Sequence, residues 1–431
     1  MTSAFLTDRY ELTMLDAAIR AGTHTRECVF EVYTRRLHGG RRYGIVAGTG
    51  RLLDLIQEFR FTDAELGWLD DNRVVDSAAI DWLADYRFSG NIWGYQEGEV
   101  YFPGSPVLVV EGTFAEAVIL ETLVLSVLNY DSAVATAASR MVSAAHGRPL
   151  AEMGSRRASE HSAVAAARAA YIAGFNATSN LEAGRTWGLP TMGTAAHSFT
   201  LLHDSEEEAF RAQVAALGSG TTLLVDTFDV AAAVDLAVEI AGTGLGAVRI
   251  DSGDLPEQVA AVRRQLDRLG AATTKITVTN DLDEYTIAAL LAAPVDSYGV
   301  GTSVVTGSGS PAAGFVYKLV ARTDAAGEWV SVAKKSPLKA SIGGRKYPVR
   351  VLSDAGVATA EVIHVGEPES AVAHHRPLLV PLVTDGVPDE RFRGAAGTAM
   401  AREHRAAAIA ELPPQAFRLS RGEPVIPTSY E

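Results

Sequence analysis

Six short apolar segments, spread over residues 150–301, constrain the fold of this chain more than any other feature of the sequence. Each one has the length of a single strand, ends in a polar cluster and precedes a stretch with helical spacing. Repeated strand-then-helix units favour a parallel sheet, and six of them indicate a barrel, complete or incomplete. A doubly wound open sheet remains an alternative, although no G-x-G-x-x-G stands at a first strand. The segments are 150–154, 189–193, 222–226, 247–251, 275–279 and 297–301.

The remainder of the 431 residues mixes helices with strands, and the length suggests two or three domains. We expect an N-terminal α/β domain with a helical linker over 1–148 and an α/β barrel domain over 149–320. Residues 321–431 return to short strands with Pro-rich and Gly-rich connections, and we expect them to rejoin the N-terminal domain.

Composition limits the class of protein. The net charge of −14 argues against nonspecific binding to nucleic acid or to an anionic membrane, so a local basic cluster must attract any anionic substrate. The single cysteine, Cys28, excludes an internal disulfide and fits a reducing compartment. The first eight residues lack the pattern of a signal peptide, and no apolar run reaches the length of a membrane span. We therefore expect a cytoplasmic protein.

The stretch 247–255 is the most informative of the strand ends. Val248 and Ile250 alternate as in a buried strand, and two carboxylates, a hydroxyl and a glycine follow at once. Ligand sites of parallel α/β proteins lie at such carboxyl ends. Asp251 and Asp254 suit a polyhydroxylated ligand, a magnesium ion or a cation that develops in a transition state. A β-turn with a helix cap is the alternative, because Asp, Ser and Gly favour turns.

Two other strand ends carry basic groups. Arg156 and Arg157 place guanidinium groups where the first segment stops, and such groups match phosphate and carboxylate geometry. A solvated surface pair is the competing interpretation. Small residues at 193–196 leave room for a ligand beside His197, although a lone histidine is more often a structural residue. No companion Cys or His stands at ligand spacing, which argues against zinc.

The remaining strand ends complete the expected site. Asp226 and Asp229 add carboxylates, for which a helix N-cap is the competing role. Polar residues follow at 279–281, and backbone amides at 299–303 and 307–309 suit a phosphate cradle. Together these groups describe a phosphorylated sugar that bears a second anionic group.

These residues, taken in order along the chain, resemble the nicotinate phosphoribosyltransferases, of the type II phosphoribosyltransferase fold. The resemblance runs nearly from end to end. The matching blocks are LTDRYELTM (6–14), RYGIVAG (42–48), GSRR (154–157), GTAAHS (193–198), VDTFD (225–229), RIDSGD (249–254), GVGT (299–302) and YKLV (317–320).

The resemblance implies a reaction, a fold and an assembly. Nicotinate and phosphoribosyl pyrophosphate would give nicotinate mononucleotide and pyrophosphate, with magnesium present and with ATP hydrolysis coupled through a phosphorylated histidine. The implied fold is α/β, an irregular (β/α) barrel packed against a split α+β N-terminal-type domain. Active sites of this family lie at the interface of a homodimer.

The resemblance also assigns roles by position. His197 is similar to the phosphorylated histidine, and Asp251 and Asp254 resemble the groups that hold the ribose and the magnesium-bound pyrophosphate. Tyr10 is similar to a ring that the partner subunit stacks on the pyridine. The expected substrate-binding residues are Tyr10, Met153, Arg156, Arg157, Ser179, Ser198, Asp226, Arg249, Asn280, Gly299, Gly301 and Thr302.

Two groups of these residues have narrower expected roles. Gly301 and Thr302 fall where relatives bind the 5′-phosphate. Arg156 and Arg249 line the expected base and phosphate region, and either of them or Arg157 meets the nicotinate carboxylate.

The choice of base rests on residues 177–180. Relatives that use nicotinamide place an Asp in this segment, whereas here it reads Ala-Thr-Ser-Asn. A carboxylate would repel anionic nicotinate, so its absence favours the acid over the amide. A nicotinamide or quinolinate phosphoribosyltransferase on the same fold is the nearest alternative, and the quinolinate enzymes are shorter and do not couple to ATP.

Rivals of other classes fit less well. A sugar-phosphate aldolase or isomerase barrel would need a Schiff-base lysine at a strand end, and neither Lys275 nor Lys318 stands there. A binding module without catalysis would not need six polar strand ends. The lysines at 334, 335, 339 and 346 suit either ATP phosphates or, by default, a solvated basic face.

Overall fold

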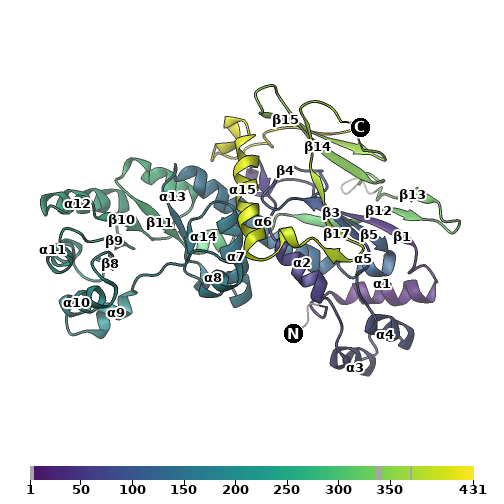
Figure 1. The fold of residues 1–431 in the computed structure, drawn as a ribbon, viewed down its shortest axis with the longest axis horizontal. Helices are drawn as coiled ribbons and strands as arrows, with labels where there is room; N and C mark the ends of the chain where they lie inside the picture. Colours follow the sequence, from purple (N-terminus) through teal and green to yellow (C-terminus); the bar gives the residue numbers. More distant parts are fainter. Residues whose placement is uncertain (1–3, 336–340, 369–370) are drawn as a thin grey trace. The chain divides into compact units, whose positions relative to one another are not determined.

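The computed structural model describes residues 4–335, 341–368 and 371–431. The chain divides into two compact units: Met1–Thr136 with Ser310–Glu431, and Ala137–Gly309. We call them the split unit and the central unit. Helix α6 (Glu121–Ala144) carries the chain from the first into the second (Figure 1). The domain boundaries expected at 148 and 320 remain a prediction.

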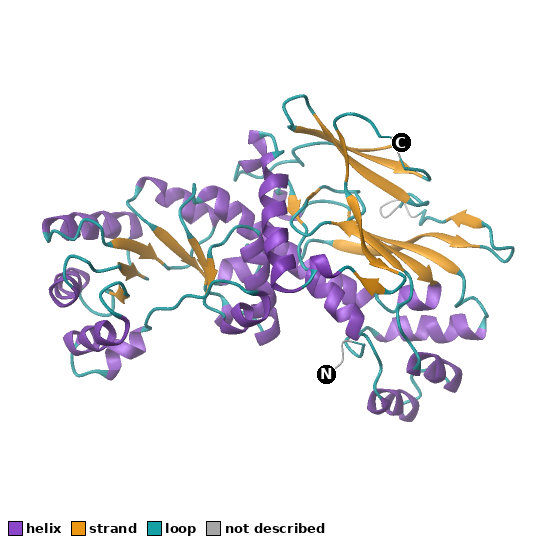
Figure 2. Ribbon diagram, viewed as in Figure 1, coloured by secondary structure: helices purple, strands orange, loops and turns teal. Residues whose placement is uncertain are grey.

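The central unit is built on a parallel six-stranded sheet of order β7-β6-β11-β10-β9-β8 (Figures 1 and 2). The sheet is a curled half-barrel, so the expected barrel is incomplete. Val248 and Ile250 are fully buried, as their alternation predicts, and Arg249 between them is only half-buried. The strands are β6 (Leu150–Glu152), β7 (Ala177–Thr178), β8 (Thr222–Leu224), β9 (Ala247–Ile250), β10 (Lys275–Val278) and β11 (Ser297–Val300).

The prediction of a strand is wrong for one of the six segments. Residues 189–193 form only an isolated bridge, at Thr191 opposite Thr178, and the sixth strand is β7 instead. Pro190 accepts a hydrogen bond from the Thr178 amide through its carbonyl, but it has no N–H with which to continue a ladder. With only two residues, β7 is too short to show a periodicity in the sequence.

Helices cover this sheet. Alanines dominate α7, and their small side chains let it lie close to β6 and β7. Helices α10, α11 and α12 pack side by side (Figure 1). The helices are α7 (Glu160–Ile172), α8 (Leu181–Trp187), α9 (His197–Leu202), α10 (Glu206–Leu217), α11 (Val230–Ala241), α12 (Leu255–Arg268), α13 (Glu284–Ala289) and α14 (Thr302–Val305), with 3-10 helices η2 (Ser155–Arg157) and η3 (Leu290–Ala292).

The split unit contains an antiparallel seven-stranded sheet of order β13-β12-β1-β5-β3-β17-β18. Strands β1 and β12 pair, as do β3 and β17, so segments from both ends of the chain share one sheet. Its strands are β1 (Glu27–Thr34), β3 (Asn91–Tyr95), β5 (Leu108–Thr113), β12 (Phe315–Thr323), β13 (Trp329–Ser331), β17 (Leu379–Thr384) and β18 (Val387–Pro388).

Two smaller sheets and several helices complete this unit. One large apolar cluster joins the helices to the seven-stranded sheet, with Phe30 stacked on Tyr317 at a centroid distance of 4.8 Å. The smaller sheets hold β14 (Lys346–Leu352), β15 (Ala358–Val365), β16 (His375–Pro377) and β19 (Thr428–Tyr430), and β2 (Gly44–Ile45) and β4 (Val100–Tyr101). The helices are α1 (Arg9–Arg20), α2 (Thr49–Glu58), α3 (Asp63–Asp71), α4 (Ser77–Ala84), α5 (Phe114–Val118) and α15 (Gly394–Ala410), with 3-10 helices η1 (His38–Gly40), η4 (Glu390–Phe392) and η5 (Pro414–Phe417).

The helical stretch Phe114–Ala144 is long and apolar enough to cross a membrane by length and composition alone. Within its most apolar window, 67% is buried inside the protein. Such burial is typical of a core helix, so the stretch is weak evidence for a membrane span.

The solvated basic face expected for the lysines at 334, 335, 339 and 346 does not include Lys346. Lys346 is buried, and its ammonium group donates to the Glu31 carboxylate at 2.6 Å, because a buried charge needs a partner. Lys334 and Lys335 are exposed, in agreement with a solvated face. Lys339 lies outside the described residues.

A buried ionic network joins the smaller sheets to α15. Arg350 is fully buried and donates to Glu361 at 2.8 Å, and its guanidinium also lies 3.6 Å from Glu99. Burial opposes ionisation of Glu99, but a hydrogen bond with His404 and the two nearby guanidinium groups outweigh it and hold the pKa of Glu99 below its usual range. Each buried charge therefore depends on its partners.

We predict that Arg350→Met lowers the free energy of unfolding by about 3–5 kcal/mol, because the buried Glu361 carboxylate loses its charged partner and Glu99 loses one of its two guanidinium groups. The matched control is Arg391→Met, whose side chain is 70% exposed and pairs with Asp389 at the surface. Its loss is expected to leave the free energy of unfolding nearly unchanged. Urea denaturation of both variants makes the comparison, and equal losses would contradict the role given to the buried network.

Candidate active site

A cavity of about 290 Å3 opens at the carboxyl edge of the parallel sheet. The loops after β6, β9, β10 and β11 contribute to its wall. Nine of the residues expected from the sequence line it. The full lining is Met153, Arg156, Arg157, Arg249, Asp251, Thr279, Asn280, Asp281, Gly299, Gly301 and Thr302.

Three guanidinium groups give the cavity its basic side. Arg156 and Arg157 are exposed on η2, and Arg249 projects from β9. Burial lowers the pKa of Arg249 from its usual value, and the charges of Asp251 and Asp226 oppose that shift. Arg249 donates to the Thr194 hydroxyl through Nη1, while its buried Nε has no hydrogen-bond partner among the described residues. An anionic ligand would supply the missing acceptor.

Two carboxylates stand at the ends of β8 and β9. Oδ2 of Asp226 accepts from the Asp251 amide at 2.8 Å and from the Ser252 hydroxyl at 2.7 Å. The Asp226 side chain is 1% exposed, and its buried Oδ1 has no hydrogen-bond partner among the described residues. Asp251 accepts from the Thr279 hydroxyl through Oδ1 and leaves Oδ2 accessible. One carboxylate is therefore fixed inside the wall and the other faces the cavity.

His197 lies against both carboxylates. Its Nε2 is 3.8 Å from Oδ1 of Asp226 and 3.9 Å from Oδ2 of Asp251. On the other side of the ring, Nδ1 is 3.0 Å from the Thr227 hydroxyl. The structure thus places the expected histidine, a cavity-lining carboxylate and a buried carboxylate in one cluster.

The floor of the cavity requires a glycine. A Cβ at Gly299 would lie 2.6 Å from Sδ of Met153 and 2.7 Å from Cγ2 of Thr279. Backbone alone therefore separates these two side chains at the end of β11. Gly301 and Thr302 follow at the rim, where the chain enters α14.

Six expected site residues do not line this cavity; His197 and Asp226 lie against Asp251, and the other four lie elsewhere. Asp254 is exposed and caps α12, accepting from the Glu257 amide at 3.3 Å, which is the contact of the competing cap interpretation. Ser179 and Ser198 are exposed on the loop after β7 and on α9. Tyr10 belongs to the split unit, on α1, where burial and the Glu121 carboxylate raise its pKa. Their roles in binding remain predictions.

Sequence reasoning missed the hydroxyl groups that hold the charged ones. Thr194, Thr227, Ser252 and Thr279 each bond to a predicted site residue. The only available signal was position, because each hydroxyl stands within three residues of an expected charged group or directly after a strand. Asp281 was also missed as a lining residue, although 279–281 was recognised as polar.

The described residues contain no group of three or more His, Cys, Asp and Glu side chains that could hold a metal ion. They nevertheless fit magnesium that arrives with a phosphorylated substrate, since this ion takes one or two carboxylates and completes its shell with phosphate oxygens and water. The accessible Oδ2 of Asp251 is the donor that this cavity offers to such an ion, whereas Oδ1 of Asp226 is buried within the wall.

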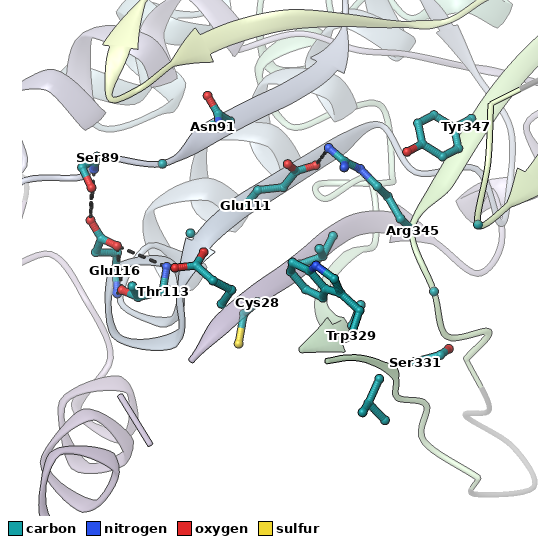
Figure 3. Close-up of a pocket in the computed structure, with 18 residues that line it drawn as sticks. Cys28, Ser89, Asn91, Glu111, Thr113, Glu116, Trp329, Ser331, Arg345 and Tyr347 are labelled. Atoms are coloured by element: carbon teal, nitrogen blue, oxygen red, sulfur yellow. Dashed lines mark hydrogen bonds and ion pairs between the residues drawn. The ribbon is translucent and has the colours of Figure 1, made fainter. Parts of the chain in front are cut away.

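A larger cavity, of about 660 Å3, lies in the split unit beside β1, β5 and β13 (Figure 3). Its charged side chains largely satisfy one another: Arg345 pairs with Glu111, and Glu116 accepts from Ser89 at 2.6 Å and from Thr113. Burial also raises the pKa of the Cys28 thiol at its edge to about 12, which leaves the thiol protonated and poorly nucleophilic. None of the expected site residues lines it. The larger cavity is therefore not the candidate active site.

Comparisons with known proteins identify relatives of this chain. Residues 5–129 match the family model of the nicotinate phosphoribosyltransferase N-terminal domain. The chain is 55% identical over 435 residues to nicotinate phosphoribosyltransferase pncB1 of Mycobacterium tuberculosis, covering 99% of this chain and 95% of the relative. This chain belongs to the nicotinate phosphoribosyltransferase family. The expected family is confirmed.

Other nicotinate phosphoribosyltransferases support the same assignment. The enzyme of Bacillus subtilis is 35% identical over 81% of this chain and 73% of its own length. The crystal structure of human nicotinic acid phosphoribosyltransferase superposes with a TM-score of 0.84 at 26% identity, covering 99% of this chain and 98% of that one. The family consists of enzymes with a mixed α/β fold.

We predict that Gly299→Ala lowers the free energy of unfolding by about 1–3 kcal/mol, because the new methyl group displaces Thr279 and Met153. Gly244→Ala is the matched control, since a Cβ there would meet nothing within 4 Å. Thermal unfolding of both variants gives the answer. Equal stability of the two variants would show that the cavity floor tolerates a side chain.

Proposed function

We propose that this protein condenses nicotinate with phosphoribosyl pyrophosphate to give nicotinate mononucleotide and pyrophosphate, in NAD salvage, while ATP is hydrolysed to ADP and phosphate. The observation that carries the proposal is the meeting of an arginine-lined cavity, the Asp251 carboxylate and His197 at one sheet edge. The identity to named nicotinate phosphoribosyltransferases supports the substrates.

The cavity supplies what the transfer step needs. The pyridine nitrogen of nicotinate carries a free lone pair at neutral pH, so no general base is required. Catalysis then rests on positioning the base and on stabilising positive charge at the ribose carbon as pyrophosphate leaves. Asp251 is the carboxylate that faces the cavity and serves the second need. Magnesium bound with the pyrophosphate would neutralise the leaving group, held through Asp251 and, as the resemblance implies, Asp254.

The basic groups of the cavity are available to bind the different anionic groups of the substrates. Arg156, Arg157 and Arg249 are available for the nicotinate carboxylate and the phosphates, and Gly301 with Thr302 for the 5′-phosphate. His197 is the proposed acceptor of the phosphoryl group of ATP, because a neutral imidazole nitrogen forms a labile bond to phosphorus.

The segment 177–180 supports nicotinate as the base. Its polar side chains are neutral: Ser179 is exposed, and Asn180 donates to the Ser155 hydroxyl at 3.0 Å while it caps α8. No carboxylate of this segment is present to repel an anionic pyridine. The aldolase alternative gains no support, because no lysine is among the residues that line the cavity.

The proposed assembly is a homodimer with shared active sites in the cytoplasm. Large apolar side chains are exposed close to His197, at Leu201 and Leu202 of α9 and at Phe228 next to Thr227. Tyr10 is exposed on α1, as a ring offered to a partner subunit would be. The net charge of −14 supports small-molecule substrates rather than nucleic acid.

The deciding experiment measures mononucleotide formation from nicotinate, nicotinamide and quinolinate, each with phosphoribosyl pyrophosphate and magnesium, with and without ATP. We expect turnover with nicotinate, stimulation by ATP and little product from the other two bases. Faster turnover with nicotinamide or quinolinate would overturn the proposed substrate. No product from any base would overturn the proposed reaction.

We predict that Asp251→Asn lowers turnover by about 100-fold to 1,000-fold while the protein remains folded, because the carboxylate no longer stabilises the ribosyl cation. Asp254→Asn is the matched variant, since Asn caps a helix as well as Asp does and the free energy of unfolding should hardly change. For this variant we expect weaker binding of phosphoribosyl pyrophosphate. Steady-state rates and thermal unfolding separate the effects, and unchanged turnover in Asp251→Asn would remove its assigned role.

A further inference from the structure

His197 is contacted at both ring nitrogens by consecutive residues. Asp226 and Thr227 lie in the loop after β8; the carboxylate faces Nε2 at 3.8 Å, and the hydroxyl lies 3.0 Å from Nδ1. We propose that Thr227 is a positioning residue, whose hydroxyl holds the His197 ring in the orientation and tautomer that accept a phosphoryl group from ATP. This inference rests on the proposed function and deepens it.

The support for the ring is rigid. Asp226 cannot turn away, because its side chain is 1% exposed and Oδ2 is engaged by the amide of Asp251 and the hydroxyl of Ser252. The Val225 amide donates to the carbonyl of Arg249 at 3.2 Å, which ties the residue before Asp226 to β9. Thr227 is β-branched, so few side-chain rotamers are open to it. Its hydroxyl is therefore presented to His197 from a fixed backbone.

The contacts of the ring define its reactive nitrogen. With a proton on Nδ1, the ring donates from Nδ1 to the Thr227 hydroxyl at 3.0 Å, and the lone pair stands on Nε2. Nε2 lies on the side of Asp251, which lines the cavity, and at 3.9 Å it makes no hydrogen bond with that carboxylate. The hydroxyl thus fixes the plane of the ring and leaves Nε2 as its one nucleophilic nitrogen. The Thr227 hydroxyl is the hydrogen-bond partner that the described residues give to Nδ1.

The orientation of the His197 ring affects phosphoryl transfer from ATP more than it affects the condensation of nicotinate with the ribosyl carbon. Phosphoryl transfer requires the acceptor nitrogen in line with the bond that breaks, and loss of the partner that orients a histidine ring lowers activity by about 10-fold to 100-fold. Condensation of nicotinate with the ribosyl carbon does not use the imidazole as a nucleophile. Loss of the Thr227 hydroxyl should therefore act on the ATP-dependent half of the cycle through His197.

Two substitutions separate the hydroxyl from the shape of the residue. Thr227→Val keeps the volume and branching and removes the hydroxyl, whereas Thr227→Ser keeps the hydroxyl. With ATP labelled at the γ-phosphate, we expect Thr227→Val to form phosphohistidine about 10-fold to 100-fold more slowly than the unaltered chain, and Thr227→Ser within about threefold of it. If Thr227→Val does not fold, as judged by circular dichroism, Thr227→Ala serves as the second variant without a hydroxyl.

A double-mutant cycle with His197→Ala shows whether the effect passes through the ring. We expect Thr227→Val to lower ATP-stimulated turnover when His197 is present and to add nothing once His197 is alanine. An equal added loss in the His197→Ala background would assign Thr227 to substrate contact or to structure instead. Phosphohistidine formation at the rate of the unaltered chain in Thr227→Val would also overturn the proposal.

Measurements on the unaltered chain separate a failure of the proposed function from a failure of the role proposed for Thr227. If it forms no nicotinate mononucleotide, the proposed function fails and the Thr227 comparison has no reaction to act on. If it forms the product with ATP coupling and the valine and serine variants behave alike, only the role of Thr227 fails.

Discussion

Parallel pairing of β6, β8, β9, β10 and β11 is the constraint on which the site depends. In a parallel sheet every strand ends at the same edge, so the residues that follow the strands are brought together although they are far apart in sequence. The hydrogen bond from the Asp251 amide to the Asp226 carboxylate then joins the ends of β8 and β9 at 2.8 Å. Backbone register, set by buried apolar residues such as Val248, thereby fixes where the side chains of the proposed active site lie.

The distribution of charge in the site opposes that of the whole chain. The protein carries a net charge of −14, yet three guanidinium groups line one cavity, and one of them has a buried nitrogen for which the described part of the chain supplies no acceptor. The carboxylates lie on the side of β8 and β9, against His197. A phosphorylated sugar would meet positive charge at its anionic groups and negative charge at its reacting carbon. One site can therefore attract an anion and stabilise a cation.

Much of the central unit followed from the sequence, and the exceptions have physical causes. Five of the six apolar segments form strands, because buried residues such as Val248 and Ile250 leave a clear apolar pattern. The segment 189–193 fails because Pro190 lacks a donor. The bond between Thr227 and His197 was invisible, since it joins residues 30 positions apart and hydroxyls are common in loops. Local patterns predict elements, whereas contacts between loops depend on the fold.

The motif Asp-Ser-Gly-Asp after β9 shows how far spacing alone can carry a functional argument. Its two carboxylates stand three residues apart and were expected to share a site. Gly253, between them, has a left-handed backbone with φ of 89°, which turns the chain away from the sheet edge. Asp251 therefore stays at the cavity, while Asp254 meets the free amides that begin α12 and caps them. The turn presents the amides of α12 to Asp254 and none of them to Asp251. In the proposed reaction, a magnesium-bound pyrophosphate would therefore compete with a helix terminus for Asp254 but not for Asp251.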